Sequence, residues 1–291
     1  MPVPLVVLRP RALHCGGGRL GADRPAVMAI LNVTEQSFFD GGRYRAVGSA
    51  VARAWEVVDE GADVLDIGGE STRPGSQGVS EAEEIGRVVP VIRALREGDR
   101  PYPIPISVDT SRAEVARQAL VAGAEIVNDV SGGHREPEIL HVAAAYNASV
   151  ILMHMRGTPR SMQHDVCYTD LLAEVCDFLV ASCAAATAAG IPAAAQAVDP
   201  GIGFGKDPEG CLEILANLGV FEEVGRPLLI GASRKSFLGK SFGHEISNRL
   251  EGSIVAAALA VAHGASLVRV HDVAETRRAV DVAAGIRRAA R

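Results

Sequence analysis

Closely spaced cysteine pairs are missing from this 291-residue sequence. Its five cysteines form no CxxC, CxxH or HxxxC pattern, and their number is odd. The sequence therefore indicates neither a disulfide framework nor a zinc site of the common spacing. Isolated thiols are typical of proteins from a reducing compartment, so we expect a cytoplasmic location.

Long runs of one residue class are missing as well. No more than two Lys or Arg residues are adjacent and the formal net charge is −6, so we expect neither a nucleic acid nor an anionic membrane as a partner. The apolar stretch 3–8 is too short for the core of a signal peptide. We also expect no apolar span long enough to cross a bilayer.

A repeated unit fills most of the chain. From residue 26 onward, a long amphipathic stretch, a Gly-Ala pair, a short apolar run and polar loop residues recur in that order. Gly61, Gly123 and Gly264 begin the clearest Gly-Ala pairs, where the C-terminus of a helix requires positive φ. Eight apolar runs without alternation predict strands buried on both faces of a parallel sheet. These runs are 27–32, 64–68, 104–109, 126–129, 150–154, 197–199, 228–231 and 267–271.

Eight strands that alternate with helices predict an α/β fold, a closed (β/α)8 TIM barrel. A doubly wound open sheet is the rival fold, but it requires a glycine-rich turn after the first strand, and residues 32–37 contain no glycine. We therefore assign residues 26–291 to one barrel domain. Residues 1–25 form an N-terminal extension, in which the glycines at 16–18 predict the turn of a β-hairpin.

Polar residues gather where the predicted strands end, and reactive groups of such barrels lie at the carboxyl ends of the strands. Asp109, Asn128 and Asp199 can accept or donate hydrogen bonds along the edge of a flat, nitrogen-rich heterocycle. Lys235 adds a cation to this set. A second set suits a pyrophosphate and Mg²⁺, because it offers donors and a neutral oxygen ligand. This second set comprises Asn32, Thr72, Arg269 and His271.

Three loops next to these strand ends contain glycine. The loops 37–42 and 71–75 follow the first two strands and are long enough to close over a ligand. The segment 199–206 has the glycine content of a phosphate-binding loop. Its spacing differs from that of a P-loop and Lys206 is not followed by Ser or Thr, so we do not assign it that role.

The strand ends, taken in order, resemble those of dihydropteroate synthases, the folate-pathway enzymes that join a pterin methyl diphosphate to 4-aminobenzoate. The resemblance covers nearly the whole chain from residue 26 onward, and the occurrence of eight motifs in order makes it specific. The motifs occupy residues 32–34, 68–75, 107–110, 128–133, 152–155, 199–206, 231–239 and 269–273.

The resemblance implies a role for each strand end. The residues that it implies for pterin binding are Asp109, Asn128, Met153, Asp199, Lys235 and Arg269, with Met153 and the alkyl part of Arg269 at the ring faces. Those implied for the diphosphate are Asn32, Thr72, Arg269 and His271, with Asn32 as a ligand of Mg²⁺. Those implied for the aminobenzoate are Thr72, Arg73, Phe204, Lys235 and Ser236. The catalytic set is Asp109, Asp199, Lys235, Arg269 and His271.

No general base or nucleophile is placed for a direct displacement, so we expect the diphosphate to leave before the amine attacks. Arg269 and His271, with Mg²⁺, would bind the leaving group, while Asp109 and Asp199 would stabilise a developing pterin cation. The partners expected are therefore small molecules. The resemblance also implies a homodimer, for which the Ala-rich stretch 251–262 is the candidate interface.

The first loop departs from the family pattern. Where the family usually reads Thr-Pro-Asp-Ser-Phe, this chain reads Thr34-Glu35-Gln36-Ser37-Phe38. Gln36 thus replaces an aspartate that helps to order the closed loops, and Glu35 is a candidate replacement for its carboxylate. Because sulfonamides mimic aminobenzoate, the sequence is compatible with an ordinary synthase and with a sulfonamide-tolerant variant.

Other functions account for parts of the same pattern. Lys235 could be the Schiff-base lysine of an aldolase barrel, which would need a lowered pKa in an apolar pocket. Gln36 makes a non-catalytic pterin- or folate-binding homologue conceivable. The methyltetrahydrofolate-binding barrel of a corrinoid methyltransferase would share the pterin edge but has no need for Arg73 or His271. The synthase accounts for the largest number of these residues.

Overall fold

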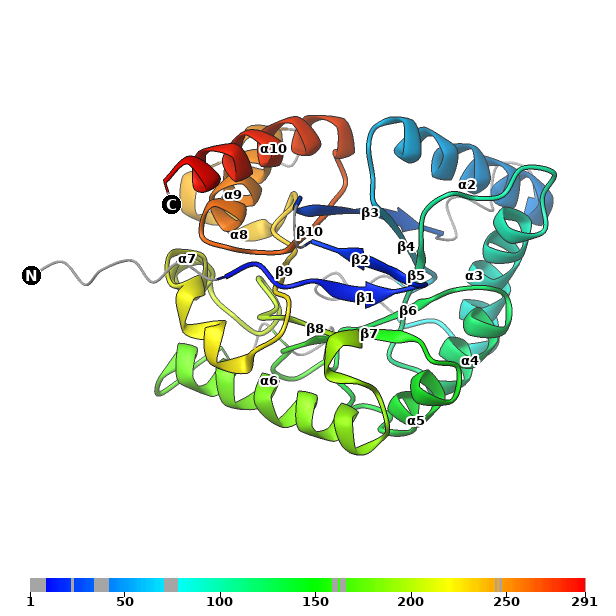
Figure 1. The fold of residues 1–291 in the computed structure, drawn as a ribbon, viewed down its shortest axis with the longest axis horizontal. Coiled ribbons are helices and arrows are strands. Elements are labelled where there is room, and N and C mark those ends of the chain that lie inside the picture. Colours follow the sequence, from blue (N-terminus) through cyan, green and yellow to red (C-terminus); the bar gives the residue numbers. More distant parts are fainter. Residues whose placement is uncertain are drawn as a thin grey trace, which may run out of the picture.

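The chain forms the predicted (β/α)8 barrel. The computed structural model describes residues 9–21, 24–33, 42–70, 78–158, 162, 166–243, 245 and 248–290, with side chains for all of these except 42–45. Eight parallel strands are hydrogen-bonded in the order β8-β7-β6-β5-β4-β3-β10-β9. A bridge between Val198 and Leu228 brings β8 next to β9 and closes the ring. Figure 1 shows the helices around this ring of strands.

The strands agree with the predicted apolar runs to within two residues at each end. They are β3 (Ala26–Asn32), β4 (Val64–Gly68), β5 (Ile106–Asp109), β6 (Ile126–Asp129), β7 (Ser149–Met153), β8 (Gln196–Asp199), β9 (Leu229–Ile230) and β10 (Leu267–Val270). The largest difference is at β5, which begins at Ile106 rather than at residue 104. Pro105 precedes it and has no N–H group to donate to the ladder.

The helices begin and end at residues with identifiable local causes. They are α2 (Gly42–Asp59), α3 (Glu81–Arg96), α4 (Ala113–Val121), α5 (Glu138–Ala145), α6 (Leu171–Ala188), α7 (Pro208–Ala216), α8 (Ser236–Phe242), α9 (Leu250–Ala262) and α10 (Val273–Ala289). The Glu83 N–H donates to Ser80 Oγ at 3.3 Å and the Ser80 N–H donates to Glu83 Oε2 at 2.8 Å, a capping box that starts α3. Each of the three glycines predicted to follow a helix has positive φ.

The predicted hairpin is confirmed and covers one end of the barrel. It consists of β1 (Leu13–Cys15) and β2 (Gly18–Leu20), which pair antiparallel. Figure 1 shows this hairpin, in blue, lying across the barrel. Ser149 Oγ, at the start of β7, donates to the His14 carbonyl at 2.6 Å, which places the hairpin at the amino ends of the strands. The carboxyl ends, where the predicted site residues lie, form the opposite rim.

Two apolar clusters form the core. The larger lies between the strands and the surrounding helices. The smaller lies inside the barrel, where Leu13 and Cys15 of the hairpin pack against inward-facing side chains such as Met28, Ile126 and Leu267. Because this cluster fills the interior near the hairpin, the polar side chains of the same strands are left to occupy the other rim.

Helix α6 contradicts one expectation from the sequence, that no apolar span reaches membrane length. Its 18 residues have a mean hydropathy of 1.7, which by length and composition alone would suffice to cross a bilayer. The expectation failed because α6 is rich in alanine and has few charged residues. In the structure α6 belongs to the outer layer of the barrel, with Val175, Leu179 and Cys183 buried in the larger cluster. An outer helix of this barrel therefore has the length and the mean hydropathy of a membrane-spanning helix.

Candidate active site

Three of the predicted site residues converge on Gly231, which follows strand β9. A Cβ atom built on this glycine would lie 3.8 Å from each of Asp199 Oδ2, Lys235 Nζ and Arg269 Cβ. Asp199 ends β8, Lys235 precedes α8 and Arg269 lies in β10, so three separate elements contribute to one place. A side chain at position 231 would occupy the space between these groups.

Arg269 links two of the predicted pterin residues, Asp109 and Asn128, into one buried network. Its Nε donates to Asp66 Oδ2 at 2.6 Å and its Nη2 donates to Asp109 Oδ2 at 2.7 Å. Asn128 Nδ2 donates to the same Asp66 oxygen at 3.0 Å. The side chains of Asp66 and Asp109 are 0% and 6% exposed, so the guanidinium group is the cation that compensates two buried carboxylates.

Asp66 is a site residue that reasoning from the sequence missed. It lies inside β4 rather than at its end, so a prediction based on the last residues of each strand does not include it. A signal was present, because Asp66 is the only charged residue of a run predicted to be buried on both faces. A carboxylate in such a run needs a partner, and an arginine from another strand was the partner to look for.

The segment after β8 surrounds Lys235. The Gly201 N–H donates to Asp199 Oδ1 at 2.7 Å, which fixes the turn that begins the segment. Lys235 Nζ donates to the Ile202 carbonyl. The same ammonium group lies 4.5 Å from the centre of the Phe204 ring, an attractive cation–π distance. One short loop therefore supplies two contacts that hold the lysine.

Burial raises the pKa values of the two aspartates in this cluster and lowers that of the lysine. It raises the pKa of Asp109 to about 7, although Arg269 acts in the opposite direction, and it also raises the pKa of Asp199. Burial lowers the pKa of Lys235 to about 8, although Asp199 favours the charged form. For Arg269, burial acts to lower the pKa, but Asp66 and Asp109 outweigh it, so the pKa is raised. Such opposed shifts are common at catalytic sites.

Two of the residues predicted for the leaving group, Asn32 and His271, lie at the ends of β3 and β10, which pair with each other. A Cβ atom on Gly68 would lie 3.5 Å from Asn32 Oδ1 and 3.6 Å from Asp109 Oδ2, so Asn32 borders the network. His271 follows β10, and its Nδ1 lies 3.1 Å from Ser233 Oγ. The His271 N–H donates to the same hydroxyl oxygen at 3.2 Å. The Ser233 hydroxyl group therefore orients His271 through contacts with both the backbone N–H and the imidazole ring of that histidine.

The structure describes some, but not all, of the remaining predicted residues. Met153, at the end of β7, is buried and pairs in register with Asp199. Ser236 is exposed at the start of α8, next to Lys235. Thr72 and Arg73 lie outside the described residues, as does the loop that contains Gln36. The structure thus places the pterin set and part of the other two sets.

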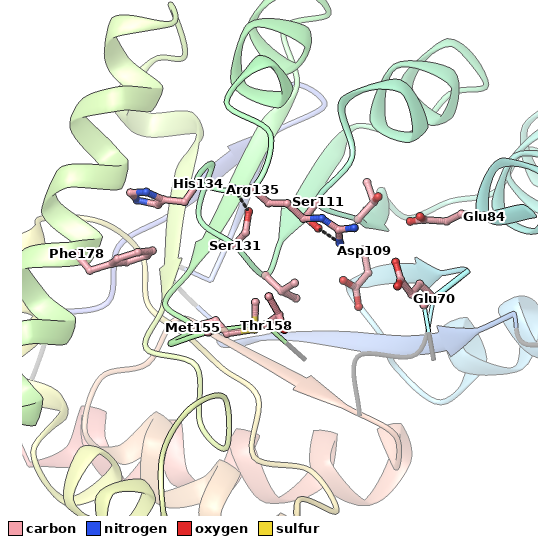
Figure 2. Close-up of a pocket in the computed structure, with 14 residues that line it drawn as sticks. Glu70, Glu84, Asp109, Ser111, Ser131, His134, Arg135, Met155, Thr158 and Phe178 are labelled. Carbon is pink, nitrogen blue, oxygen red and sulfur yellow. Dashed lines mark hydrogen bonds between the residues drawn. The ribbon is translucent and has the colours of Figure 1, made fainter. Parts of the chain in front are cut away.

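A cavity of about 420 Å³ borders the network at Asp109. Figure 2 shows the acidic side chains of Glu70 and Glu84 on the same side of this cavity as Asp109, with His134 and Phe178 on the other. Apart from Asp109, the residues predicted to hold the pterin are not among the described residues that line it. The cavity therefore adjoins the predicted site rather than coinciding with it.

The donor set at the rim limits which metal could bind. Within the described ranges, no group of three or more His, Cys, Asp or Glu side chains is placed to hold a metal ion. Asn32 is exposed at the end of β3 and offers one amide oxygen. Mg²⁺ keeps several waters and needs only one or two protein ligands when substrate phosphates complete its shell. The rim therefore fits Mg²⁺ that binds together with a diphosphate.

Comparisons with known proteins decide the family. The family model described as pterin binding enzyme matches residues 28–271. The dihydropteroate synthase of Synechocystis is 47% identical over 251 residues, which are 86% of this chain and 86% of the relative. The chain belongs to the dihydropteroate synthase family. The resemblance carried by the strand-end motifs is thereby confirmed.

Solved structures of the dihydropteroate synthase family agree with this barrel. The Yersinia pestis enzyme, solved with a sulfonamide drug complex, has a TM-score of 0.88 and 41% identity, and the match covers 95% of this chain and 99% of that one. The Xanthomonas albilineans enzyme in complex with 7,8-dihydropteroate has a TM-score of 0.82 and 43% identity, covering 94% and 98%. The lowered pKa of Lys235 alone would suit an aldolase, but these relatives do not favour that function or a non-catalytic homologue.

Proposed function

We propose that this chain condenses 6-hydroxymethyl-7,8-dihydropterin diphosphate with 4-aminobenzoate to give 7,8-dihydropteroate and diphosphate. The observation that carries the proposal is the convergence of Asp109, Asp199 and Lys235 around Arg269, at the rim of a barrel whose relatives are dihydropteroate synthases. Residues 26–291 would form the catalytic barrel and residues 1–25 its extension.

The pterin is proposed to bind in the network around Arg269. Its heterocyclic edge carries both donors and acceptors, which match the carboxylates of Asp109 and Asp199, the Asn128 amide and the Lys235 ammonium group. The Met153 side chain and the alkyl part of Arg269 would lie against the two ring faces. The support for this arrangement is that these side chains come from five strands and from the residue before α8, and still meet at one rim.

The diphosphate is proposed to lie towards Asn32 and His271. Arg269 and His271 would donate hydrogen bonds to its oxygens, with Thr72 as a further donor. Asn32 would be the protein ligand of Mg²⁺, which when bound with the substrate neutralises part of the diphosphate charge. Ser233 supports this role of His271, because its hydroxyl group lies 3.1 Å from Nδ1 and so orients the imidazole ring at the rim.

The aminobenzoate is proposed to bind next to Lys235. Phe204 would flank its ring, while Lys235 and Ser236 border its polar groups, together with Thr72 and Arg73. Ser236 is the first residue of α8, directly after Lys235, and β9 precedes both along the chain.

The chemistry follows from what these side chains can stabilise. The bond between the pterin methylene carbon and the diphosphate oxygen breaks, and the diphosphate leaves with the electron pair. Arg269 and His271 bind it more strongly as its charge grows, and the negative field of Asp109 and Asp199 stabilises the cation that remains. The nitrogen lone pair of aminobenzoate then forms the new C–N bond, and that nitrogen releases a proton to solvent.

Release of diphosphate tests the proposed activity. We expect diphosphate to appear only when the pterin diphosphate and aminobenzoate are both present, and dihydropteroate to appear in equal amount. A sulfonamide should raise the KM for aminobenzoate, because it is an analogue of that substrate. An unchanged KM would identify the sulfonamide-tolerant variant. Tight pterin binding without any diphosphate release would instead favour the non-catalytic homologue.

A homodimer is the assembly that we propose, with helices α9 and α10 as its interface. The two helices pack against each other. Val255 and Leu259 of α9 are 56% and 53% exposed, and Val282 and Ile286 of α10 are 63% and 65% exposed. Contiguous exposed aliphatic side chains are typical of protein interaction surfaces, and a two-fold axis would bury them against the same helices of a second copy.

Replacement of Leu259 by glutamate is expected to convert the dimer into a monomer, because a charge would be buried without a partner at the interface. Sedimentation equilibrium or light scattering measures the change in mass. The matched control is Val121→Glu, because Val121 is 58% exposed on α4, away from the two helices. A Leu259→Glu variant that remains dimeric would rule this interface out.

The proposed location is the cytoplasm. All five cysteines are free thiols in the structure, and Cys15, Cys183 and Cys211 are buried. Burial raises the pKa of Cys15 to about 12 and that of Cys183 to about 11, which keeps these thiols protonated and unreactive. A chain with five unpaired thiols suits a reducing compartment.

A further inference from the structure

Lysine is rare in this chain and two of its copies lie near the proposed site. Of the 29 Lys and Arg residues, only Lys206, Lys235 and Lys240 are lysines. Lys240 is exposed on α8, and Lys235 belongs to the rim described above. Lys206 is 3% exposed, lies in the glycine-rich segment after β8, and has no part in the proposed reaction. Its burial therefore needs another explanation.

Lys206 makes two hydrogen bonds in the interior. Its Nζ lies 2.8 Å from His154 Nδ1 and donates to the Phe204 carbonyl at 3.0 Å. Burial, together with the charge of Lys206, lowers the pKa of His154 to about 3, so the imidazole is neutral. A neutral imidazole with a lysine donor at Nδ1 accepts at that nitrogen and carries its proton on the other.

The loop that carries Lys206 lies directly on the segment that follows β7. A Cβ atom at Gly201 would lie 1.9 Å from the His154 carbonyl oxygen, and a Cβ atom at Gly205 would lie 2.7 Å from the Arg156 carbonyl oxygen. Only glycine permits such close backbone approach. Lys206 links the two segments, because one of its hydrogen-bond partners, His154, lies in the segment after β7 and the other, Phe204, lies in the glycine-rich loop.

The same loop holds Lys235. The Ile202 carbonyl accepts from Lys235 Nζ, and the Phe204 ring lies 4.5 Å from that nitrogen. Lys206 fixes the carbonyl group of Phe204 and so limits where its ring can lie. The two lysines are therefore connected through one residue, and a displacement of the loop would move both contacts of Lys235.

An ammonium group in this position is costly. Transferring a charged group from water into the interior is unfavourable unless the group is paired and hydrogen-bonded. Burial accordingly lowers the pKa of Lys206 to about 7, although the nearby Cys211 and Asp199 act in the opposite direction. An apolar side chain would fill the same space with a smaller desolvation free energy. This difference indicates that the role of Lys206 is to make its two hydrogen bonds.

We propose that Lys206 is a positioning residue, which fixes the loop 200–206 against His154 and thereby sets the place of the Phe204 ring and the Lys235 ammonium group. This inference rests on the proposed function in one respect, the assignment of Phe204 and Lys235 to the aminobenzoate side of the site. It gives the glycine-rich segment a role that differs from phosphate binding.

Lys206→Met tests the proposal by kinetics, because methionine has similar length and lacks the donor. We expect the KM for aminobenzoate to rise about tenfold, since the Phe204 wall of its pocket is displaced. The dissociation constant of the pterin diphosphate should change less than about threefold, because Lys235 is only one of the six residues proposed to hold the pterin. Lys240→Met is the matched control and should leave both values unchanged. Equal changes in both constants, or no change in the folded variant, would overturn the proposal.

His154→Leu provides a second variant in case Lys206→Met does not fold. It removes the acceptor in the other segment and leaves Lys206 in place. The KM for aminobenzoate should rise in the same direction but less, and the double variant should resemble Lys206→Met, because both changes disrupt the same contact. Additive effects of the two substitutions, or a normal KM in folded His154→Leu, would contradict the proposed link.

Nuclear magnetic resonance separates this proposal from the proposed activity. Isotope-labelled lysine gives three side-chain signals, one for each lysine, which single substitutions assign. We expect Lys206→Met to shift the Lys235 signal, because the Phe204 ring acts on it at 4.5 Å, and Lys240→Met to leave it in place. An unshifted Lys235 signal in folded Lys206→Met would overturn the positioning role, whatever reaction the protein catalyses.

Discussion

Replacement of Asp109 or Asp199 by asparagine is expected to lower kcat by about 100- to 1000-fold. Both carboxylates are buried beside Arg269 and Lys235, where a negative charge acts more strongly than in water. If the diphosphate leaves first, the pterin cation is stabilised only by such fixed charges. Asparagine preserves the shape of the side chain and removes the charge, so it isolates this effect.

The two substitutions differ in what else they disturb. At position 199, an amide oxygen can still accept from the Gly201 N–H, so the turn after β8 is preserved. At position 109, the loss of charge also removes one of the two carboxylates that hold Arg269. We therefore expect Asp199→Asn to lower kcat with little change in stability, and Asp109→Asn to weaken diphosphate binding as well.

Steady-state kinetics with varied pterin diphosphate measure the first prediction. The matched control is Asp99→Asn, which removes an exposed charge in the loop after α3. A large fall in kcat indicates stabilisation of the transition state, whereas a raised KM with normal kcat indicates ground-state binding only. Near-normal turnover in both variants would argue against a cationic pterin and in favour of a concerted displacement.

The common location of the residues proposed for the pterin could be predicted from the sequence because of the symmetry of the barrel. Parallel strands deliver their last residues to one rim, so a list of strand ends is also a list of neighbours. Asp109, Asn128 and Asp199 were found in this way, and each lies where that rule places it. The rule needs only the strand boundaries, which apolar runs indicate well.

The same rule does not predict contacts that are made by residues inside a strand. Asp66 is two residues from the end of β4, and its role appears only when Arg269 is seen to reach it from β10. The segment that contains Lys206 has the glycine content of a phosphate-binding loop, because glycine is needed wherever another group comes close to the backbone. The glycine content does not show whether that group is a phosphate or another part of the chain. In the structure that neighbour is the chain at His154 and Arg156. Side-chain reach between strands is set by packing, which local sequence does not encode.

Replacement of Arg269 by methionine is expected to abolish measurable activity and to lower the free energy of unfolding by about 3 to 5 kcal/mol. Arg269 forms ion pairs with both Asp66 and Asp109, and its removal leaves both buried carboxylates without this partner. Loss of the guanidinium group also removes the proposed donor to the diphosphate. Chemical denaturation measures the stability, and the diphosphate assay measures the activity.

The pH dependence of this stability loss is part of the prediction. The pKa of Asp109 is already raised to about 7 with Arg269 present, and without Arg269 it will rise further. A carboxyl group whose pKa is higher in the folded than in the unfolded state destabilises the fold as pH rises from about 4 towards the folded value. The difference between variant and parent should therefore be larger at about pH 8 than at about pH 5. A pH-independent difference would contradict this origin.

Asp66→Asn combined with Arg269→Met separates the two roles of the arginine. The double variant buries one carboxylate fewer, so it should recover part of the stability that Arg269→Met loses, and the coupling between the sites should exceed about 0.5 kcal/mol. Activity should not recover, because the donor to the diphosphate is still missing. A double variant that regained both would show that Arg269 acts only by neutralising Asp66, and would move the leaving-group site away from β10.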